Sequence, residues 1–487
     1  MEREENTPSI KKNYLFNTLY QVISIVFTLF SASYVAKVLG PEGTGVLGFT
    51  NSIVAYFAIF AALGKVSYGQ REIAMHRGNT KDTTRLFWEI ELLSVCSTIV
   101  ALLAWIVWII VSPQYTIYYI VLSIGLITVS FDITWFYSGL EKFDRIVLMN
   151  FMVRVIDIIA LILFIKSNND TLLYMGIING VGLLGHIYMW MCLPRFIFDV
   201  KLKELHPFRG HLKQTLAYFI PTVATSIYTV LDKTMIGGIT SSLSENGYYE
   251  QATKLINAMK ALLFSLNTVL TTRQSFLFSG GRLSEIKEKI NMSFEYMFLL
   301  SIPFMFGMMG IASNFVPWFF GGEYNAVVIL LYLMSPLPFI ICISNVLGSQ
   351  YLTPSGQRVR SSKAIIIGSI VNLLLNIVLI PRYKASGAAV ASCVAESVIS
   401  IIYVYMSKGY TSWLRLGKIA YKKIIAAICM LIVIVAFGRG KPASAITTLL
   451  QVILGMVTYL GGLLLLGDRF VLTAIKMMKG IVRSKDG

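Results

Sequence analysis

The sequence predicts an all-α polytopic membrane protein with about 14 transmembrane helices: two six-helix lobes in a pseudo-two-fold parallel repeat, plus two C-terminal helices. Three observations lead to this fold class. The 487 residues are 56% hydrophobic and only 14% charged, with a mean hydropathy of +0.69, whereas soluble domains average about 25% charged residues. The apolar residues form runs long enough to cross about 30 Å of hydrocarbon. The Lys and Arg residues gather in alternate gaps between these runs.

Each apolar run is expected to form an α-helix, because a helix satisfies its backbone hydrogen bonds internally where the bilayer offers no water. A run of about 20 residues is sufficient for one crossing. The predicted spans are residues 14–39, 46–69, 86–111, 115–139, 143–166, 171–194, 214–237, 248–271, 290–312, 325–350, 362–380, 386–407, 420–437 and 444–467.

The distribution of positive charge predicts the orientation of these spans. Of the 42 Lys and Arg residues, 31 lie in the two tails and in the gaps that follow every second span, including the gap that ends with Lys422 and Lys423. The other gaps hold only five: Lys166, Arg382, Lys384, Arg439 and Lys441. The positive-inside rule therefore places both termini in the cytoplasm. The outer gaps are short, and residues 41–45 form the first of them.

The longest inner gap divides the chain into lobes. It is a basic linker at 195–213, between an N-terminal lobe at 1–194 and a C-terminal lobe at 214–407, followed by two helices and a basic tail at 408–487. A weak repeat supports the division: Gly40 ends the first span and Gly45 opens the second, while Gly237 ends the seventh and Gly247 opens the eighth. Six crossings separate the copies, so both have the same orientation, as in a parallel repeat.

Several kinds of soluble chemistry are excluded. The basic residues form no continuous patch or arm, which argues against nucleic-acid binding. There is no nucleotide-binding glycine motif and no His or Cys spacing typical of a metal site, so no cofactor and no metal site is predicted. The outer gaps leave no room for an external catalytic domain, and the chain is not expected to be an enzyme. Transport would be driven by an ion gradient, with H⁺ or Na⁺ as the coupling ion, or by the supply of substrate.

Six basic residues lie inside the predicted spans, where each costs roughly 2.5–3.5 kcal/mol and should face a wet cavity or a partner. Lys65 is near the inner end of its span and is predicted to extend its ammonium to the membrane surface. Lys260 has no acidic residue three or four positions away and is the foremost candidate for binding an anion. The substrate-binding candidates of this kind are Lys37, Arg154, Lys233, Lys254 and Lys260.

Polar stripes mark three spans as borders of a central hydrophilic cavity. Polar residues recur at helical spacing in the first, seventh and eighth spans, although stripes of Ser and Thr also occur at helix–helix contacts. The amide side chains in these stripes complete the candidate binding set: Asn17, Gln21, Asn257 and Asn267.

Carboxylates inside the spans are candidates for coupling H⁺ or Na⁺, because their charge state can change with access to water. Some are equally explained as partners of neighbouring groups: Arg154 and Asp157 can neutralise each other, and Glu250 and Lys254 are a favourable helical pair. Glu396 is next to small residues and could instead bond between helices. The candidates are Asp132, Asp157, Asp232, Glu250 and Glu396.

Six stretches, in this order, resemble the Wzx-type oligosaccharide flippases, also called polysaccharide transporters. They are VAKVLGPEGTGVLGFT at 35–50, GQREIA at 69–74, DITWFYSGLE at 132–141, the DKTMIG to GYYE segment at 232–250, GGEY at 321–324 and NVLGSQYLTPSG at 345–356. That family is similar in fold to the multidrug and toxin extrusion antiporters and the lipid II flippases.

The resemblance implies a transporter in the bacterial cytoplasmic membrane that moves an undecaprenyl-diphosphate-linked oligosaccharide to the outer leaflet for capsule, O-antigen or exopolysaccharide assembly. Implied partners are membrane lipid, the polysaccharide polymerase and the chain-length machinery, with the transporter as a monomer. A lipid II flippase shares the diphosphate and the polyprenyl tail and stays open as an alternative. A multidrug antiporter would favour a cavity rich in carboxylates, and a membrane polysaccharide polymerase would need a long external loop.

Overall fold

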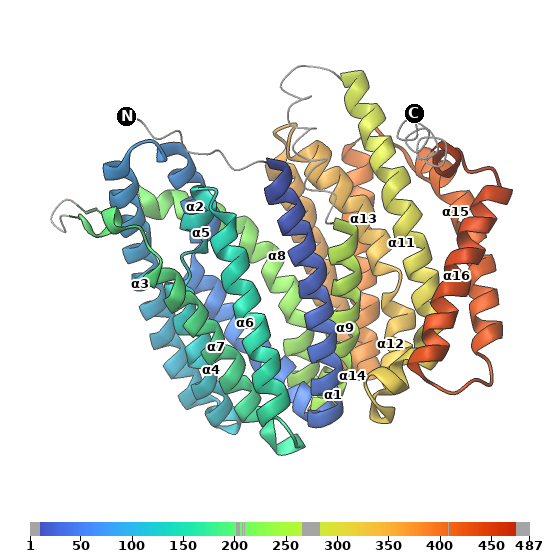
Figure 1. Ribbon diagram of the computed structural model, residues 1–487, viewed down its shortest axis with the longest axis horizontal. Helices are drawn as coiled ribbons and strands as arrows, with labels where there is room; N and C mark the ends of the chain where they lie inside the picture. The colour runs from blue at the N-terminus through green and yellow to red at the C-terminus, as the bar shows by residue number, and fades with distance from the viewer. Residues whose placement is uncertain are drawn as a thin grey trace, which may run out of the picture. The chain divides into compact units, whose positions relative to one another are not determined.

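The computed structural model describes residues 10–200, 205, 206, 208, 210–264, 283–407 and 409–473, and excludes the side chains of 10–22, 220–222, 224–229 and 283. Helices dominate, and these ranges contain no β-strand (Figure 1). Contacts divide the chain into two compact units, 1–247 and 248–487. The boundary between the predicted lobes, at the basic linker 195–213, is a different division of the chain. It stays a prediction.

The first unit is built from long helices joined by short turns. Three single turns of 3₁₀-helix, Pro113–Tyr115, Asn168–Asp170 and Arg195–Phe198, lie between or after them. The helices are α1 (Ile10–Ala62), α2 (Lys65–His76), α3 (Thr80–Val111), α4 (Thr116–Phe131), α5 (Thr134–Gly139), α6 (Phe143–Phe164), α7 (Thr171–Met191) and α8 (His211–Thr240), followed by the first residues of α9 (Leu243–Phe264).

The second unit begins within α9 and continues to the C-terminal helices. A 3₁₀ turn, Gly322–Tyr324, precedes α12, and a π-helical turn, Gly348–Leu352, follows α13. Its remaining helices are α11 (Leu283–Phe319), α12 (Ala326–Met334), α13 (Leu337–Leu347), α14 (Arg358–Met406), α15 (Trp413–Gly438) and α16 (Ala445–Leu465).

The number of crossings agrees with the prediction. Ten helical segments of the described chain are long and apolar enough to span a membrane. Two of these, α1 and α14, each contain two predicted spans on either side of a kink, and the more polar α8 and α9 add the seventh and eighth. The fold is therefore the all-α polytopic membrane fold with 14 transmembrane helices that the apolar runs indicate.

Two of the predicted outer loops are sharp kinks instead. Gly40 has φ 67° and ψ 179° inside α1, and the helix resumes directly at Pro41, whose fixed φ suits the first turn of a helix. Residues 41–45 are therefore helical, so the predicted loop there is wrong. In α14, Lys384 has φ 52° and ψ −129° and separates two helical segments in the same way.

Two of the four glycines of the weak sequence repeat, Gly45 and Gly247, each lie against the backbone of the other's helical turn inside the first unit. A Cβ atom on Gly45 would lie 1.8 Å from the carbonyl oxygen of Leu243, and one on Gly247 would lie 2.1 Å from the carbonyl oxygen of Pro41. Neither distance leaves room for a side chain. The repeat therefore marks two turns whose backbones make reciprocal close contact, which only glycine permits at both positions.

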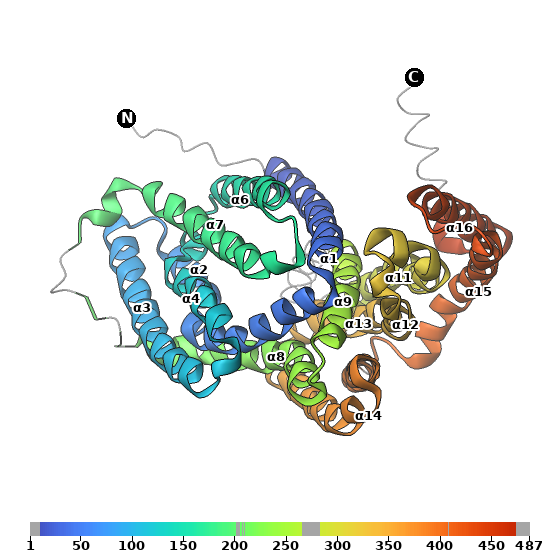
Figure 2. The ribbon, with the colours of Figure 1, turned by 90° about the horizontal axis from the view of Figure 1, so that it is seen from below.

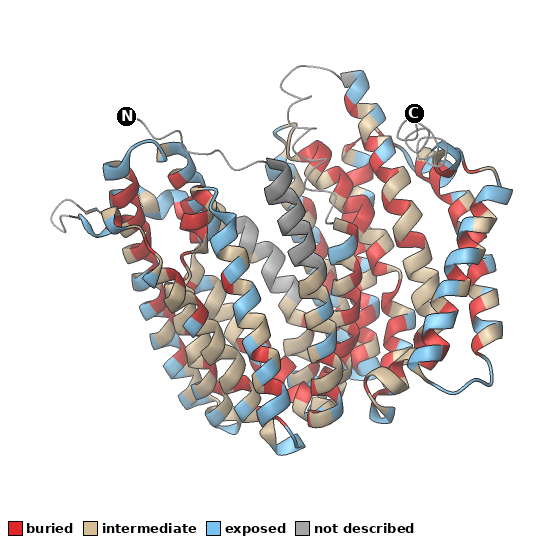
Figure 3. Cartoon of the chain, in the orientation of Figure 1, coloured by how far each residue is buried: buried red, intermediate tan, exposed pale blue. Residues whose placement is uncertain are grey.

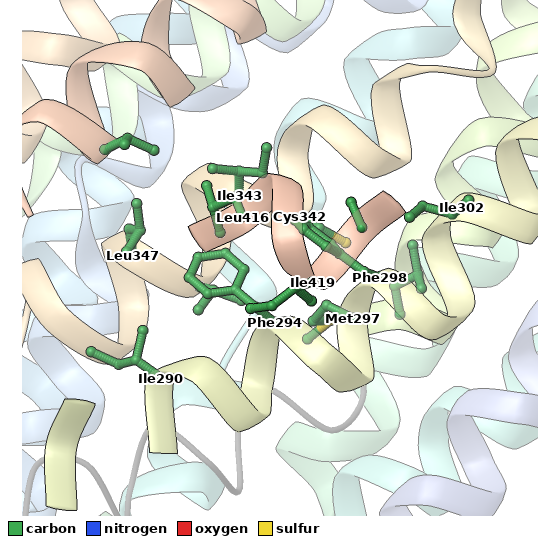
Figure 4. Packing of buried hydrophobic residues seen from close by; sticks show 14 of the residues in the cluster. Ile290, Phe294, Met297, Phe298, Ile302, Cys342, Ile343, Leu347, Leu416 and Ile419 are labelled. Atoms are coloured by element: carbon green, nitrogen blue, oxygen red, sulfur yellow. The ribbon is translucent and has the colours of Figure 1, made fainter. Parts of the chain in front are cut away.

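Both units contain buried and exposed residues along their helices (Figure 3), and many residues of each kind are hydrophobic. Seen from below, the helices of the first unit lie side by side (Figure 2). Its buried clusters include the aromatic residues Trp105, Trp135 and Phe136. In the second unit, α11, α13 and α15 meet around the aromatic rings of Phe294 and Phe298 and around aliphatic side chains (Figure 4). The outward residues of α3 are exposed and aliphatic, which suits contact with lipid rather than water: Ile99, Val100, Leu103, Ile106, Val107 and Ile110.

A buried ion triad joins the last two helices to the rest of the second unit. The Lys423 ammonium lies 2.6 Å from Glu295 Oε2 and 3.1 Å from Asp468 Oδ2, and the lysine side chain is 1% exposed. The sequence counts Lys423 among the basic residues of a cytoplasmic gap; the structure places it inside α15, buried against the carboxylates of Glu295 and Asp468. Truncating one member of such a buried group leaves uncompensated charge.

Replacing Lys423 with Met is expected to destabilise the second unit by about 3–5 kcal/mol, because Glu295 and Asp468 lose their cation. Thermal unfolding of the purified protein in detergent measures the effect. Lys418→Met changes an exposed lysine of the same helix and should leave the unfolding temperature near that of the unchanged protein. Equal unfolding temperatures for the two variants would contradict the prediction.

Candidate functional site

Two helix breaks meet in the first unit and create its most polar interior region. Leu63 and Gly64, with φ of 43° and 77°, separate α1 from α2. Asp132 and Ile133 separate α4 from α5, and α5 packs against α2 (Figure 1). A transmembrane helix that stops inside the bilayer leaves backbone groups that need other partners, and such breaks recur at transport sites.

Side chains from other helices supply those partners. The carbonyl oxygen of Val129, in the last turn of α4, accepts a hydrogen bond of 2.8 Å from Lys65 Nζ. The carbonyl oxygen of Phe131 accepts one of 3.0 Å from Trp190 Nε1 of α7. Both oxygens are among the final carbonyls of α4, which have no partner within the helix. The break is thus held open by hydrogen bonds to α2 and α7.

Four titratable side chains gather at this break. Lys65 Nζ lies 3.5 Å from Glu91 Oε1 of α3, and His186 Nδ1 of α7 lies 3.7 Å from Asp132 Oδ1. Asp132 Oδ1 also accepts hydrogen bonds from the Thr134 amide and hydroxyl, at 2.9 and 2.6 Å, and so orients the start of α5. We call Lys65, Glu91, Asp132 and His186 the charge cluster.

The position of Lys65 corrects a prediction made from its place in the sequence. The residue is 2% exposed, so its ammonium does not extend to the membrane surface. Its ion pair and its bond to α4 hold it inside the unit. The prediction was wrong because nearness to the end of a span says nothing about which neighbouring helices cover a side chain.

A cavity of about 500 Å³ reaches the charge cluster. Its walls come from α1, α2, α4 and α8 of the first unit and are mostly apolar. Lys65 and Asp132 are the charged residues that line it. The lining residues are Ala55, Ala58, Ile59, Ala62, Gly64, Lys65, Val66, Ser67, Val129, Asp132 and Val230.

A separate network joins α3 to the beginning of α8. Glu89 Oε2 lies 2.8 Å from His211 Nε2, and Glu89 Oε1 accepts a bond of 3.0 Å from the His206 amide. His211 Nδ1 lies 2.7 Å from the Tyr68 hydroxyl of α2. These contacts fasten the residues before α8 to the rest of the first unit, which is a structural role for two histidines of the predicted linker.

Of the predicted site residues of the first unit, Asp132 belongs to the charge cluster, and the others that are described lie at three further places. Lys37 is exposed, shortly before the kink in α1. Asp157 of α6 is buried and lies within electrostatic reach of Arg154, as their spacing predicts. Asp232 is buried in α8, while Lys233 is partly buried and its carbonyl oxygen accepts a 2.8 Å bond from Asn246.

The second unit pairs the remaining predicted charges. Lys254 lies 3.6 Å from Glu250, which confirms the predicted helical ion pair. Lys260 of α9 lies within electrostatic reach of Glu396 of α14, a partner far away in sequence. Asn257 is exposed. The side chains of the other amide candidates, Asn17, Gln21 and Asn267, lie outside the described residues.

Sequence reasoning missed Glu89, Glu91 and His186, although all three lie within predicted spans. The signal that could have found them is the one used for the other acidic candidates, a titratable residue in an apolar run. Their partners could not have been found in the same way. Lys65 and Glu91 are on different helices, and only the packing of α2 against α3 brings them together.

Comparisons with known proteins agree with the architecture. The family model described as "Polysaccharide biosynthesis protein" matches residues 10–271. A protein of Escherichia coli (strain K12) named "Putative O-antigen transporter" is 24% identical over 400 residues, which cover 81% of this chain and 96% of that protein.

Two solved structures share the fold. The lipid II flippase MurJ in an inward closed conformation has a TM-score of 0.71 and 18% identity, covering 92% of this chain and 97% of that one. An inward-facing multidrug resistance MATE family transporter of the MOP superfamily has a TM-score of 0.66 and 13% identity, covering 81% of this chain and 95% of that one.

Two of the sequence stretches quoted above, at 69–74 and 132–141, pack against each other where α2 meets α5. A Cβ atom on Gly69 would lie 2.3 Å from Trp135 Cε3, and that indole is fully buried. Gly69→Ala is therefore expected to destabilise the first unit by about 1–3 kcal/mol through overpacking. Thermal unfolding in detergent measures this. Gly78→Ala is the control, because a Cβ there meets no atom within 4 Å; equal stability of both variants would contradict the expected overpacking.

Proposed function

Because this chain belongs to the polysaccharide biosynthesis protein family, we propose that it moves a polyprenyl-diphosphate-linked oligosaccharide repeat unit from the cytoplasmic to the outer leaflet of the bacterial cytoplasmic membrane. The resemblance to the Wzx-type flippases is confirmed at the level of the family. The chain is a multi-pass membrane protein and a transport protein rather than an enzyme. In the proposal both termini are cytoplasmic, transport proceeds by alternating access, and the product is used for capsule, O-antigen or exopolysaccharide assembly.

The observation that carries this proposal is the family match to residues 10–271 in a chain with 14 apolar crossings. The lysines inside the spans suit the negative charge of the proposed substrate. A diphosphate needs cations, and the spans contain lysines that the bilayer would otherwise disfavour. The polyprenyl tail can stay in lipid while the sugars use polar side chains.

Lys260 is the lysine to which we assign binding of the diphosphate, with Lys37, Arg154, Lys233 and Lys254 as further candidates. It is partly buried on α9, and Glu396 is close enough to balance its charge in the absence of substrate. A phosphate oxygen would compete with this carboxylate for the ammonium, and a charge-assisted bond of this kind contributes about 1.5–3 kcal/mol. The pairing also explains how a lysine can be kept inside a span.

The fold is also that of a lipid II flippase, and a lipid II substrate has the same diphosphate and tail, so it is the second candidate. Deletion of the gene distinguishes the two. We expect lipid-linked oligosaccharide repeat units to accumulate on the cytoplasmic leaflet while lipid II stays at its normal level, as measured by extraction and mass spectrometry of the lipid intermediates. Accumulation of lipid II alone would favour the second candidate, and unchanged intermediates would reject both.

Lys260→Ala is expected to lower surface polysaccharide by roughly tenfold or more, because losing a charge-assisted contact of this size weakens binding by at least that factor. Quantitative carbohydrate staining, normalised to the amount of transporter in the membrane, measures the effect. Lys363→Ala removes an exposed lysine at the start of α14 and should leave polysaccharide unchanged. Normal polysaccharide from a normally expressed Lys260→Ala protein would remove Lys260 from the binding site.

A further inference from the structure

The charge cluster of the first unit contains more negative than positive charge. Lys65 pairs with one carboxylate, Glu91, and the second carboxylate, Asp132, lies against His186, which is neutral or cationic according to its protonation. With a neutral His186 the cluster carries a net charge of about −1. A net charge inside a membrane protein is costly, and addition of one proton removes it.

Among the described residues, no ion pair joins a further charged group to the four members of the charge cluster. The indole of Trp135 on α5 lies against Glu91, and the cavity residues contributed by α1 and α8 are uncharged. The neighbouring carboxylate of α3, Glu89, already binds His211 and the backbone before α8. Within the described part of the chain, the cluster therefore has only its own four members to share the charge.

Glu91 also begins a buried polar stripe on α3. Ser94 and Thr98 follow at three and seven residues, so all three lie on one helical face. Each is at most 3% exposed, and the Ser94 and Thr98 hydroxyls have no hydrogen-bond partner among the described residues. Buried polar atoms of this kind are usually satisfied by ordered water. The stripe therefore forms a polar track that leads from the cluster into the bilayer part of α3.

The other end of the cluster is accessible. Asp132 has a side chain that is 28% exposed, and it lines the cavity together with Lys65. Water in this cavity can deliver a proton to Asp132, and His186 is 3.7 Å away to share it. Glu91, at 2% exposure, is reached only through the interior. Asp132 can therefore take up a proton from water, His186 can share it, and Glu91 is the buried acceptor.

We propose that Lys65, Glu91, Asp132 and His186 form a proton-binding site that holds one exchangeable proton. The proton enters from water through Asp132 and is shared within the cluster, with no bond other than the O–H or N–H bond formed or broken. A sodium ion is disfavoured as the ligand, because the Lys65 ammonium already occupies the position between the Glu91 carboxylate and the carbonyl of Val129. Given the proposed function, this proton is the coupling ion for flipping.

Proton release from the purified protein tests the site without any transport assay. Detergent-solubilised protein is titrated from about pH 5 to about pH 9, and the protons released per chain are counted with an indicator dye. Asp132→Asn and Glu91→Gln each leave one carboxylate for Lys65, so each variant should release about one proton fewer than the unchanged protein. Size-exclusion profiles report whether the variants are folded. If only one of them folds, its proton count is enough to test the site.

Asp144→Asn is the matched control, since Asp144 is an exposed carboxylate of the same unit, outside the cluster. It should release as many protons as the unchanged protein. Proton counts that are the same for the control and for both cluster variants would overturn the proton site. Displacement of the proton by added sodium would also overturn the proposal, because the cluster would then bind a metal ion.

Flipping of a lipid-linked oligosaccharide in proteoliposomes tests the coupling separately. The unchanged protein should flip faster when a pH gradient is imposed, and Asp132→Asn should flip at a rate that the gradient does not change. Flipping that is insensitive to the gradient in the unchanged protein would reject the coupling role. Absence of any flipping by a protein that shows the expected proton count would reject the proposed function and leave the proton site in place.

Discussion

The hydrogen bond from Lys65 to the carbonyl of Val129 is the contact on which the first unit depends. In hydrocarbon a helix can stop only where other groups satisfy its last carbonyls. Lys65 does this for α4, at 2.8 Å, and Trp190 does it for the carbonyl two residues later. The break lets α5 turn against α2, brings Asp132 to the cavity, and requires Glu91 nearby to balance the lysine. One interruption of a helix therefore organises both packing and charge.

In both units a buried lysine is paired with carboxylates from other parts of the chain. Lys423 pairs with Glu295 and Asp468 in the second unit, just as Lys65 pairs with Glu91 in the first. Removal of one partner from such a group is far more costly than the group itself is stabilising. The two groups differ in access: Lys423 is enclosed by helices that pack tightly, whereas the charge cluster adjoins a cavity. Enclosure suits a structural role, and contact with a cavity suits a group that exchanges protons.

Lys260 shows how tertiary structure changes the meaning of a residue. In the sequence it is an isolated cation, because no acidic residue lies one helical turn away. In the folded second unit Glu396 is within electrostatic reach, and it comes from a helix more than a hundred residues further along the chain. The candidate binding lysine is thus part of a pair, and a substrate anion has to be a better partner than a carboxylate. This condition favours a ligand with more than one negative oxygen, such as a diphosphate.

The sequence by itself determined the fold class, the fourteen crossings, the helical pair of Glu250 and Lys254, and the family resemblance, because length, periodicity and spacing along one helix are local properties. Only the tertiary structure decided that residues 41–45 continue a helix, that Gly45 and Gly247 meet opposing backbones, and that Lys65 and Lys423 are buried in ion pairs. Those outcomes depend on which helices are neighbours. Helix neighbours are chosen by the packing of whole surfaces, and no run of twenty residues contains that information.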